Sequence, residues 1–299
     1  MTNKTKGTLL VLVCVALWGL IPVVAKLGQS SLDNHQFLFW SSLVSFVVLT
    51  STTVFKGNYR LIKTVSMRQG LYLAFLGLLG TYFYYLFLYL GYASAVGLEV
   101  LVVQYSWPIL IVILSLVILR ERLSLHGLAA IVLGFIGVSI VLTQGQFDQI
   151  NVSNPRVILL VAAGAFCFAL FSVLSKTIQF DSTLVVSIYF LSASLASLSS
   201  MTYFSEFVVP QASDWLPILL NGVLVNGFSY LFWIQALKIS NASYLAPFTY
   251  LAPILSAIYL VLFFDEKITV YYLVGLVCVI GGGLINAMAK PGLKESGPG

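Results

Sequence analysis

Ten long apolar stretches dominate this sequence and limit what it can fold into. Each is close to the ~20 residues that a helix needs to cross the hydrocarbon core of a bilayer. Ten such helices occupy most of the 299 residues and leave short loops, without room for a separate domain outside the membrane. The predicted spans are residues 8–26, 36–55, 70–89, 98–119, 125–142, 157–176, 184–204, 215–235, 244–263 and 270–289.

The composition agrees with a chain embedded in lipid. Hydrophobic residues make up 60% of the chain and charged residues 8%, whereas an average soluble domain has ~25% charged residues. So few charges cannot cover a water-facing surface, which excludes a soluble enzyme, a disordered chain and a nucleic-acid-binding module. The apolar runs are continuous and do not alternate with a period of two. We therefore predict an all-α polytopic protein that passes many times through the cell (inner or plasma) membrane.

The positive charges predict how the chain is oriented. Counted over alternate loops, twelve of the 15 lysines and arginines fall on one side, and only Lys26, Arg156 and Lys267 fall on the other. Lysine and arginine are enriched in cytoplasmic loops. Both ends of the chain lie on the side with twelve, so we predict that both termini are cytoplasmic.

The two halves of the chain resemble each other when one is shifted along the other. A shift of 145 residues aligns most of the matches, and a shift of 150 aligns the beginnings of the halves. The order of these matches indicates a duplication. The matched positions are Tyr105 with Tyr250, Pro108 with Pro253, Ile109 with Ile254, Leu110 with Leu255, Glu121 with Glu266, Arg122 with Lys267, Gly137 with Gly282, Trp18 with Phe168 and Lys26 with Lys176.

Each half contains five predicted spans, and this odd number has a consequence for topology. The second copy must enter the membrane from the opposite side. Inverted repeats of this kind are the architecture of alternating-access transporters, with the substrate site near the midplane between the copies. We predict ten transmembrane helices in two inverted five-helix repeats, over residues 1–145 and 146–290, followed by a disordered tail over residues 291–299.

Four features, in order, resemble a known family. They are Ala-Leu-Trp-Gly before Lys26, Arg-Glu-Arg-Leu after Pro108, Asp-Glu-Lys-Ile after Pro253, and a glycine-rich last span in each half. Over nearly the whole chain, this set resembles the drug/metabolite transporter superfamily, specifically its ten-span EamA-type exporters. The stretch Gln-Tyr-Ser-Trp-Pro is also similar to the Asn-Tyr-x-Trp-Pro of aromatic amino acid exporters, with Gln104 in place of asparagine.

The resemblance implies a secondary transporter that exports small metabolites, above all amino acids with aromatic or neutral side chains. It also implies that spans one, three and four, with their repeat partners six, eight and nine, surround the cavity. Drug-like cations, nucleobases and sugar derivatives are alternative solutes. A membrane receptor or membrane enzyme is the alternative from another class. An enzyme should have paired catalytic groups inside the membrane, and only Glu99 lies there, so we predict no enzymatic activity.

Glu99 is the one acidic residue that begins an uninterrupted apolar run, since the other nine lie in loops, tails or helix ends. An ionisable group in a membrane segment is costly and marks a functional candidate, here a proton carrier or a partner for a substrate ammonium. The alternative is an interfacial residue at a helix start, where negative charge is favourable. Transport would then be facilitated diffusion.

Three matched pairs are candidates for coupling or gating. Glu121 and Glu266 end symmetric helices, and we predict that they cap these helices or pair with Arg122 and Lys267. Terminal lysines usually snorkel to the interface, but the repeat gives Lys26 and Lys176 a second interpretation as gate residues. The remaining pair consists of two prolines that kink helices at matched depths and serve as hinges or expose carbonyl groups to a cavity, namely Pro108 and Pro253.

Aromatic and amide side chains in the middle of spans are the candidates for substrate binding. Mid-helix Tyr and Trp carry a polar group that needs a partner, so they favour a cavity over lipid, where their rings can stack on an aromatic solute or hold a cation. Amides can bind a substrate carboxylate or amine, or join helices. The predicted residues are Trp18, Tyr82, Tyr85, Gln104, Tyr105, Trp107, Phe168, Asn226, Tyr230, Trp233 and Tyr250.

The sequence contains no P-loop, no cluster of metal ligands and no hydrolase motif. The three cysteines all lie inside apolar runs and are predicted to be small buried hydrophobes. We therefore predict no cofactor, no metal and no disulfide. The expected partners are a small-molecule substrate, the lipid bilayer and, for a coupled carrier, protons. We expect no nucleic acid, and a monomer or weak dimer.

Overall fold

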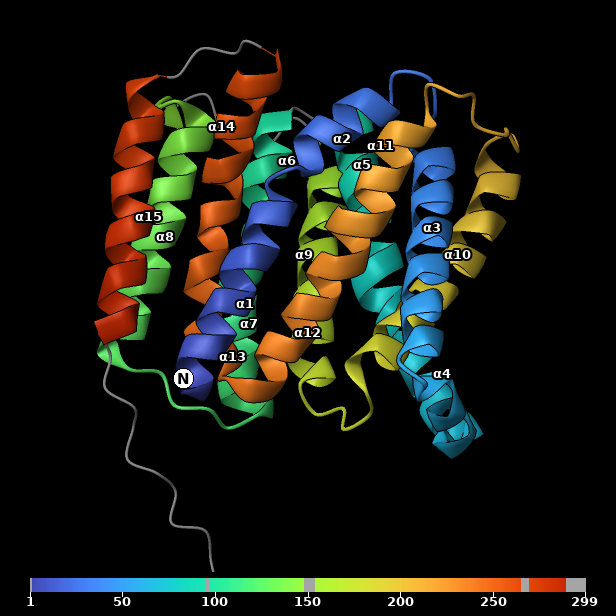
Figure 1. Cartoon of the computed structure of the whole chain (residues 1–299). Helices are drawn as coiled ribbons and strands as arrows, with labels where there is room; N and C mark the ends of the chain where they lie inside the picture. Colours follow the sequence, from blue (N-terminus) through green and yellow to red (C-terminus); the bar gives the residue numbers. More distant parts are fainter. Residues whose placement is uncertain (1, 95–96, 148–153, 265–268, 289–299) are drawn as a thin grey trace, which may run out of the picture.

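The computed structural model describes residues 2–94, 97–147, 154–264 and 269–288, with the backbone alone at positions 89, 92, 93, 97–99 and 101. Within these ranges the chain is helical and contains no strand. The helices pack side by side, so that the connecting loops gather at two ends (Figure 1). The elements are α1 (Asn3–Trp18), α2 (Ile21–Gly28), α3 (Asn34–Phe55), η1 (Asn58–Thr64), α4 (Met67–Gly77), η2 (Leu78–Phe83), α5 (Tyr84–Ser94), α6 (Gly97–Gln104), α7 (Trp107–Ile118), α8 (Leu125–Thr143), α9 (Pro155–Ser175), α10 (Ser182–Phe204), α11 (Trp215–Leu219), η4 (Leu220–Phe228), α12 (Ser229–Ile239), α13 (Ala242–Leu245), η5 (Ala246–Tyr250), α14 (Leu251–Phe264) and α15 (Val270–Met288).

Nine helices in the described part of the chain are long and apolar enough to cross a membrane. They coincide with nine of the ten predicted stretches, and the fourth stretch holds the shorter apolar helix Val102–Ile118. The prediction of an all-helical, multi-pass membrane protein is therefore confirmed, while the count of ten stays a prediction. The N-terminus and the end of α15 lie at the same end of the bundle (Figure 1), as the predicted orientation requires.

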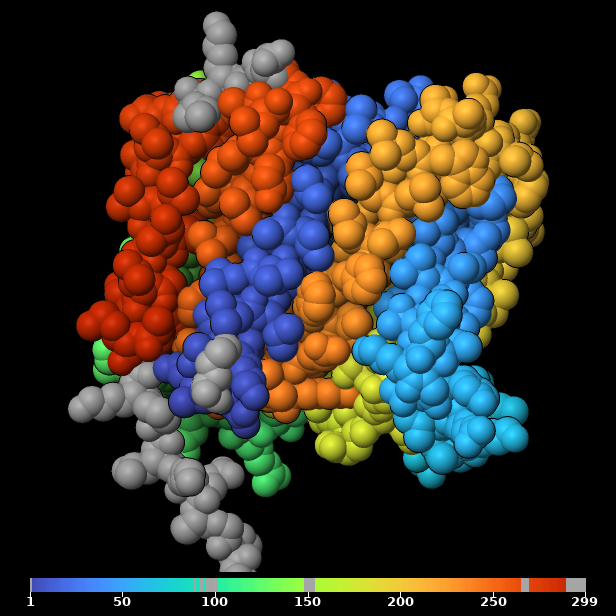
Figure 2. Space-filling view, viewed as in Figure 1, coloured from blue at the N-terminus to red at the C-terminus, as the bar shows by residue number. Residues whose placement is uncertain are grey.

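The helices of the two halves interleave. The major contacts pair α3 with α10, α8 with α15, α1 with α12, and α5 with α9. Each pair joins a helix from the first half of the chain to one from the second. Figure 2 shows one result, in which the N-terminal helices lie on the surface between segments from the C-terminal half. The core therefore depends on both halves at once.

Breaks in three of the predicted spans shape the centre of the bundle. Two residues separate α1 from α2, and Pro22 lies in the first turn of α2. Tyr105 and Ser106 separate α6 from α7, and Pro108 follows. The short 3₁₀ helix η5, which contains Pro247, connects α13 to α14. Proline lacks the N–H that would bond to the carbonyl group four residues earlier, so each break leaves backbone carbonyl groups without their helical partner.

Two further spans contain π-helical turns, η2 and η4. Such turns are rare and often occur at functional sites. A glycine lies close to each turn and against a neighbouring helix. A Cβ atom on Gly77 would lie 2.6 Å from the Cα of Tyr189 on α10, and one on Gly222 would lie 2.8 Å from the carbonyl oxygen of Ser41 on α3. At both positions the helices approach too closely for any side chain.

Candidate functional site

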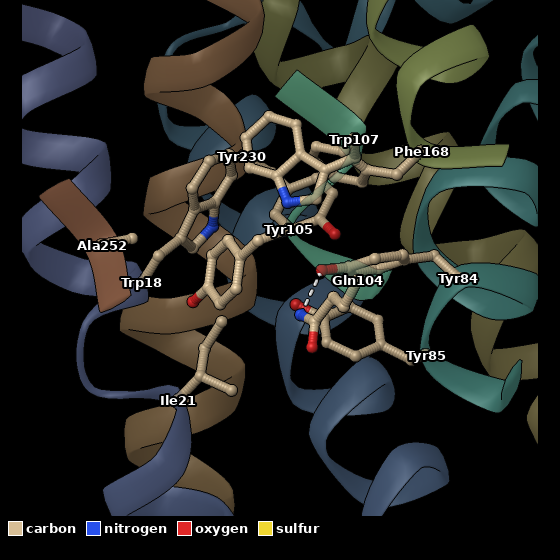
Figure 3. Close-up of a pocket in the computed structure, with 10 residues that line it drawn as sticks. All are labelled: Trp18, Ile21, Tyr84, Tyr85, Gln104, Tyr105, Trp107, Phe168, Tyr230 and Ala252. Carbon is tan, nitrogen blue, oxygen red and sulfur yellow. Dashed lines mark hydrogen bonds between the residues drawn. The ribbon is translucent and has the colours of Figure 1, made fainter. Parts of the chain in front are cut away.

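A pocket lies in the centre of the bundle, where the breaks in α1–α2 and α6–α7 meet α5, α9, α12 and α14 (Figure 3). Its empty volume is about 330 Å³, including the space that is open to the outside. Its lining residues are Trp18, Ile21, Tyr84, Tyr85, Gln104, Tyr105, Trp107, Phe168, Tyr230 and Ala252.

Seven of the eleven residues predicted to bind substrate line this single pocket. Their elements come from both halves of the chain, although the residues were selected only as aromatic or amide groups in the middle of spans. The pocket therefore supports the argument that such side chains favour a cavity over lipid. The seven are Trp18, Tyr85, Gln104, Tyr105, Trp107, Phe168 and Tyr230.

Trp18 lies at the centre of the aromatic cluster. Its ring centroid is 5.9 Å from that of Trp107, 5.8 Å from Phe168 and 6.2 Å from Tyr230, with the ring planes steeply inclined in each case. The Trp107 and Phe168 centroids are 4.9 Å apart. Edge-to-face pairs at these distances are favourable beyond the area they bury. The cluster therefore holds its rings in defined orientations around the pocket (Figure 3).

The polar groups of the pocket are few and positioned by hydrogen bonds. The Gln104 side-chain nitrogen donates to the Tyr84 hydroxyl at 2.8 Å, which connects α6 to α5. The Tyr230 hydroxyl donates to the carbonyl oxygen of Gly80 at 3.0 Å, and Gly80 lies in the π-helical turn η2. None of the ten lining residues carries a formal charge. The site is thus aromatic, with one amide and several hydroxyl groups.

Four predicted binding residues lie outside this lining. Trp233 lies directly behind it, with its ring 5.6 Å from that of Trp18 and its indole nitrogen donating to a serine hydroxyl, Ser172, at 3.0 Å. Tyr82 packs on the neighbouring Phe83. Asn226 and Tyr250 are buried. Within the described residues, neither the Asn226 Oδ1 atom nor the Tyr250 hydroxyl has a hydrogen-bond partner.

Three lining residues were not predicted from the sequence. Tyr84 begins α5 immediately after a π-helical turn, and neither hydrophobicity nor mid-helix position distinguishes it from its aromatic neighbours. Ala252 has no distinctive side chain, but it lies 145 residues after Trp107, so the internal repeat contained the signal. Ile21 lines the pocket because α1 breaks just before it, beside the proline at position 22.

At the end of the bundle where the N-terminus lies, Glu121 holds three segments together. Its carboxylate accepts hydrogen bonds from the backbone N–H groups of Ala242 at 3.0 Å and Ser243 at 2.9 Å, and from the Ser243 hydroxyl at 2.7 Å. It also lies 3.3 Å from the ammonium group of Lys176. We call these four residues the Glu121 junction. It joins the chain beyond α7 to the end of α9 and the start of α13.

Lys176 extends the junction to α12. Its ammonium group donates to the carbonyl oxygens of Leu237, at 3.0 Å, and of Ser240. Burial lowers the pKa of Lys176 from its usual 10.5, and the charge and hydrogen bond of Glu121 partly raise it again. The lysine does not snorkel to the surface, and it lies beside Glu121, where the sequence predicted Arg122 as the cation.

The other gating candidates are placed in part. The Lys26 ammonium lies 4.1 Å from the centroid of the Phe264 ring, a cation–π contact. Pro108 and Pro253 lie in the first turns of α7 and α14, which are the helices that follow the breaks. The side chain of Glu99 and the whole of Glu266 lie outside the described residues. Within the described ranges, no three His, Cys, Asp or Glu residues form a group that could hold a metal ion.

Comparison with known families identifies the chain. The family model of EamA-like transporters matches residues 5–143 and residues 155–288. The chain belongs to the EamA-like transporter family. Members of this family are transporters and not enzymes, and the many apolar helices agree with a protein embedded in a cell membrane.

Curated relatives of this EamA-like transporter differ in the solutes that they are named for. The "Aromatic amino acid exporter YddG" of Ancylobacter novellus is 26% identical over 87% of this chain and 89% of that protein. The "S-adenosylmethionine uptake transporter" of Rickettsia prowazekii is 27% identical over 82% of this chain and 79% of that one. The "Probable amino-acid metabolite efflux pump" of Escherichia coli is 25% identical over 94% of both chains.

A solved crystal structure has the same fold as the EamA-like transporter described here. It superposes with a TM-score of 0.83 and covers 94% of this chain and 96% of its own, at 22% sequence identity. At that identity the likeness concerns the fold alone. The overall arrangement of helices therefore also occurs in an experimentally determined structure.

Proposed function

We propose that this EamA-like transporter exports amino acids with aromatic or neutral side chains from the cytoplasm by alternating access. The observation that carries the proposal is the uncharged aromatic pocket around Trp18, which lies between helix breaks in the centre of the bundle. Aromatic rings at these distances can stack on a flat side chain. The amide of Gln104 and the nearby hydroxyl groups can bond the polar end of the solute. The names of two relatives support the solute class.

The proposed architecture is ten spans in two inverted repeats, with both termini in the cytoplasm. Four observations support the relationship between the two halves. The family model matches the chain in two parts of similar length. The 145-residue shift relates Tyr85 to Tyr230 and Trp107 to Ala252, and all four residues line the pocket. The same shift relates Gly77 to Gly222, which both permit a close helix approach. The π-helical turns η2 and η4 also fall at related places in the two halves.

In this proposal the Glu121 junction closes the cytoplasmic side of the pocket. It connects segments from both halves of the chain through a largely buried ion pair and hydrogen bonds to backbone groups. Breaking a buried pair is costly, so such a junction can keep one side closed until a solute binds. Pro108 and Pro253 are the proposed hinges, because each follows a break beside the pocket. At the opposite end of the bundle, Lys26, which contacts the Phe264 ring, is the proposed gate residue.

Two driving forces are compatible with the sequence. Glu99 is the proposed proton carrier if export is coupled to proton entry, because it is the one acidic residue that begins an uninterrupted apolar run and such a group marks a functional candidate. Without such a group, the protein equilibrates its solute down the concentration gradient. The two cases differ in how flux responds to a pH gradient.

Counterflow in proteoliposomes tests the proposed function. Vesicles containing the purified protein are loaded with an unlabelled amino acid, and entry of labelled phenylalanine, tryptophan or threonine is followed with and without a pH gradient. We expect entry of the aromatic amino acids to exceed that in protein-free vesicles. Acceleration by a pH gradient that is lost in Glu99→Gln would support proton exchange. Flux that is independent of pH would support a passive carrier, with Glu99 a structural residue.

A second solute class is favoured by one observation. The pocket presents aromatic faces and no formal charge among its lining residues, and such surfaces bind sulfonium and quaternary ammonium groups by cation–π contact. A relative named as an S-adenosylmethionine uptake transporter agrees with this chemistry. A quaternary ammonium ion therefore belongs in the same counterflow assay. Flux of that cation, without flux of any amino acid from folded protein, would replace the first proposal with the second.

A further inference from the structure

The pocket contains residues from related positions of the two halves, but one related pair of tyrosines contributes only one member to its lining. The 145-residue shift relates Tyr105 to Tyr250, and each is followed by a proline three residues later. Tyr105 is partly exposed and lines the pocket. Tyr250 is fully buried and does not line it. The two tyrosines hold equivalent places in the sequence, but in the structure only Tyr105 lines the pocket.

Tyr250 is accommodated in its buried place, yet its hydroxyl group has no partner there. A Cβ atom on Gly134 of α8 would lie 2.2 Å from the Tyr250 ring, so this glycine makes the space that the ring occupies. The centroid of the Phe135 ring lies 6.5 Å from that of the Tyr250 ring. The hydroxyl makes no hydrogen bond within the described residues. A buried polar group without a partner is costly, so this arrangement is not the one in which the hydroxyl is best satisfied.

We propose that Tyr250 is a substrate-contacting residue of the cytoplasm-facing state, in which it takes the place that Tyr105 has here. The inference rests on the proposed exchange of conformations between the two halves. If the halves exchange, Tyr250 enters the pocket and Tyr105 leaves it. The Tyr250 hydroxyl then donates a hydrogen bond to a carboxylate or carbonyl oxygen of the solute. The solute class is that of the pocket, an aromatic or neutral molecule with such an acceptor.

The structure also indicates what holds Tyr250 out of the pocket. Tyr250 is the last residue of η5, which follows α13 directly. The first backbone N–H groups of α13, those of Ala242 and Ser243, are bound by Glu121. The Glu121 junction therefore fixes the beginning of the short segment that ends at Tyr250. Loss of the Glu121 carboxylate should release this segment and favour the state in which Tyr250 is accessible.

Cysteine accessibility tests the exchange without requiring a solute. Tyr105→Cys and Tyr250→Cys are made separately in a background without native cysteines, and each protein is reconstituted in nanodiscs, where both faces are open to a charged methanethiosulfonate. We expect the cysteine at position 105 to react faster than the one at position 250. Adding Glu121→Gln should raise the rate at 250 and lower the rate at 105, each by about 10-fold, as the loss of charge-assisted hydrogen bonds implies. The background replaces three residues with alanine, namely Cys14, Cys167 and Cys278.

The control is Glu206→Gln, an exposed acidic residue beyond α10 at the other end of the bundle. It should leave both rates unchanged. Reaction rates that rise at both positions in Glu121→Gln would show a general loosening and overturn the proposal. A cysteine at position 250 that stays unreactive both with and without Glu121→Gln would also overturn it. An exchange of rates in a protein that moves no amino acid would support the proposal for Tyr250 and reject the proposed solute.

A second variant keeps the proposal testable if the cysteine at position 250 prevents folding. Tyr250→Phe removes only the hydroxyl group, which has no partner in the described state. We expect this variant to be at least as resistant to thermal unfolding as the parent protein. A lower melting temperature would mean that the hydroxyl is bonded in the resting state, which contradicts the inference.

Discussion

The carboxylate of Glu121 lies 3.3 Å from the ammonium group of Lys176, and both side chains are largely shielded from solvent. The two residues belong to different halves of the chain and lie beside the start of α13. Removing one partner of a pair in this place costs more than removing one partner of an exposed pair, because the other charge is left buried and uncompensated.

We expect the effects of replacing Glu121 and Lys176 on the free energy of unfolding to be coupled. Glu121→Gln and Lys176→Gln should each lower the free energy of unfolding, and the double variant should lose less than the sum of the two, with a coupling of about 1–3 kcal/mol. The measurement is unfolding of the four proteins in detergent. Strictly additive losses would show that the two groups do not interact in solution.

The same pair predicts how stability depends on pH. Lys176 has a pKa below its usual 10.5 in the folded protein, so between these two values the unfolded chain binds more protons, and stability rises with pH. Glu121→Gln removes the group that raises this pKa, and the rise should therefore begin at a lower pH. Melting temperatures of Glu121→Gln measured across pH, with and without Lys176→Gln, isolate the lysine. If the two profiles differ by a constant amount, the pKa assignment is wrong.

The hydrogen bond between Gln104 and Tyr84 should affect solute affinity more than folding. Tyr84→Phe removes the hydroxyl that accepts from the amide, and a hydrogen bond is worth ~0.5–1.5 kcal/mol. We expect the apparent KM in counterflow to rise by about 2- to 10-fold. Tyr203→Phe is the control, because this residue is exposed at the end of α10. Equal effects of Tyr84→Phe and Tyr203→Phe on the apparent KM would show that the pocket hydrogen bond does not determine solute affinity.

Trp18 should determine preference for aromatic solutes. Trp18→Leu keeps an apolar side chain but removes the ring that packs on Trp107, Phe168 and Tyr230. We expect flux of phenylalanine to fall more than flux of threonine, because a ring-to-ring contact is worth ~0.5–1.5 kcal/mol beyond buried area. Trp40→Leu, in a separate aromatic group with Trp215, should reduce neither selectively. An equal loss for both solutes would indicate a role in folding alone.

Three glycines provide a matched test of helix approach. Gly77→Ala and Gly222→Ala would each place a Cβ atom within 3 Å of a neighbouring backbone, whereas Gly281→Ala would meet nothing within 4 Å. We expect the first two to be destabilised and the third to be unchanged or stabilised by up to ~1 kcal/mol, the gain from alanine in a helix. Thermal unfolding in detergent distinguishes them. Similar melting temperatures for all three would contradict the close packing described here.

The sequence predicted the helices and the aromatic character of the pocket well, for a physical reason. Long apolar stretches can only be satisfied as helices in lipid, so predicted and observed segments agree closely, as at residues 157–176 and α9. Aromatic residues with a polar atom avoid lipid, and this preference selected Trp18, Tyr105 and Trp107 for the pocket.

The partners of individual side chains could not be predicted in the same way. Tyr84 faces the pocket from the beginning of a helix that follows a π-helical turn, and periodicity of 3.6 residues does not indicate where such a turn occurs. Lys176 meets Glu121 only because α9 ends beside the chain that leaves α7. That proximity arises from tertiary packing, which the sequence does not reveal, whereas Arg122 was expected beside Glu121 only because it is near in sequence.

The break between α1 and α2 has no counterpart in α9, which runs unbroken from Pro155 to Ser175. Two halves that differ in this way cannot be isoenergetic after they exchange shapes. An uncoupled carrier built from them has different apparent affinities and different maximal rates at its two faces. Detailed balance still requires the ratio of maximal rate to half-saturating concentration to be equal in both directions. In the proposed exchange, the broken helix would make the speed and saturation of the two faces of an uncoupled carrier different, while the solute gradient alone would set the direction of its net flow.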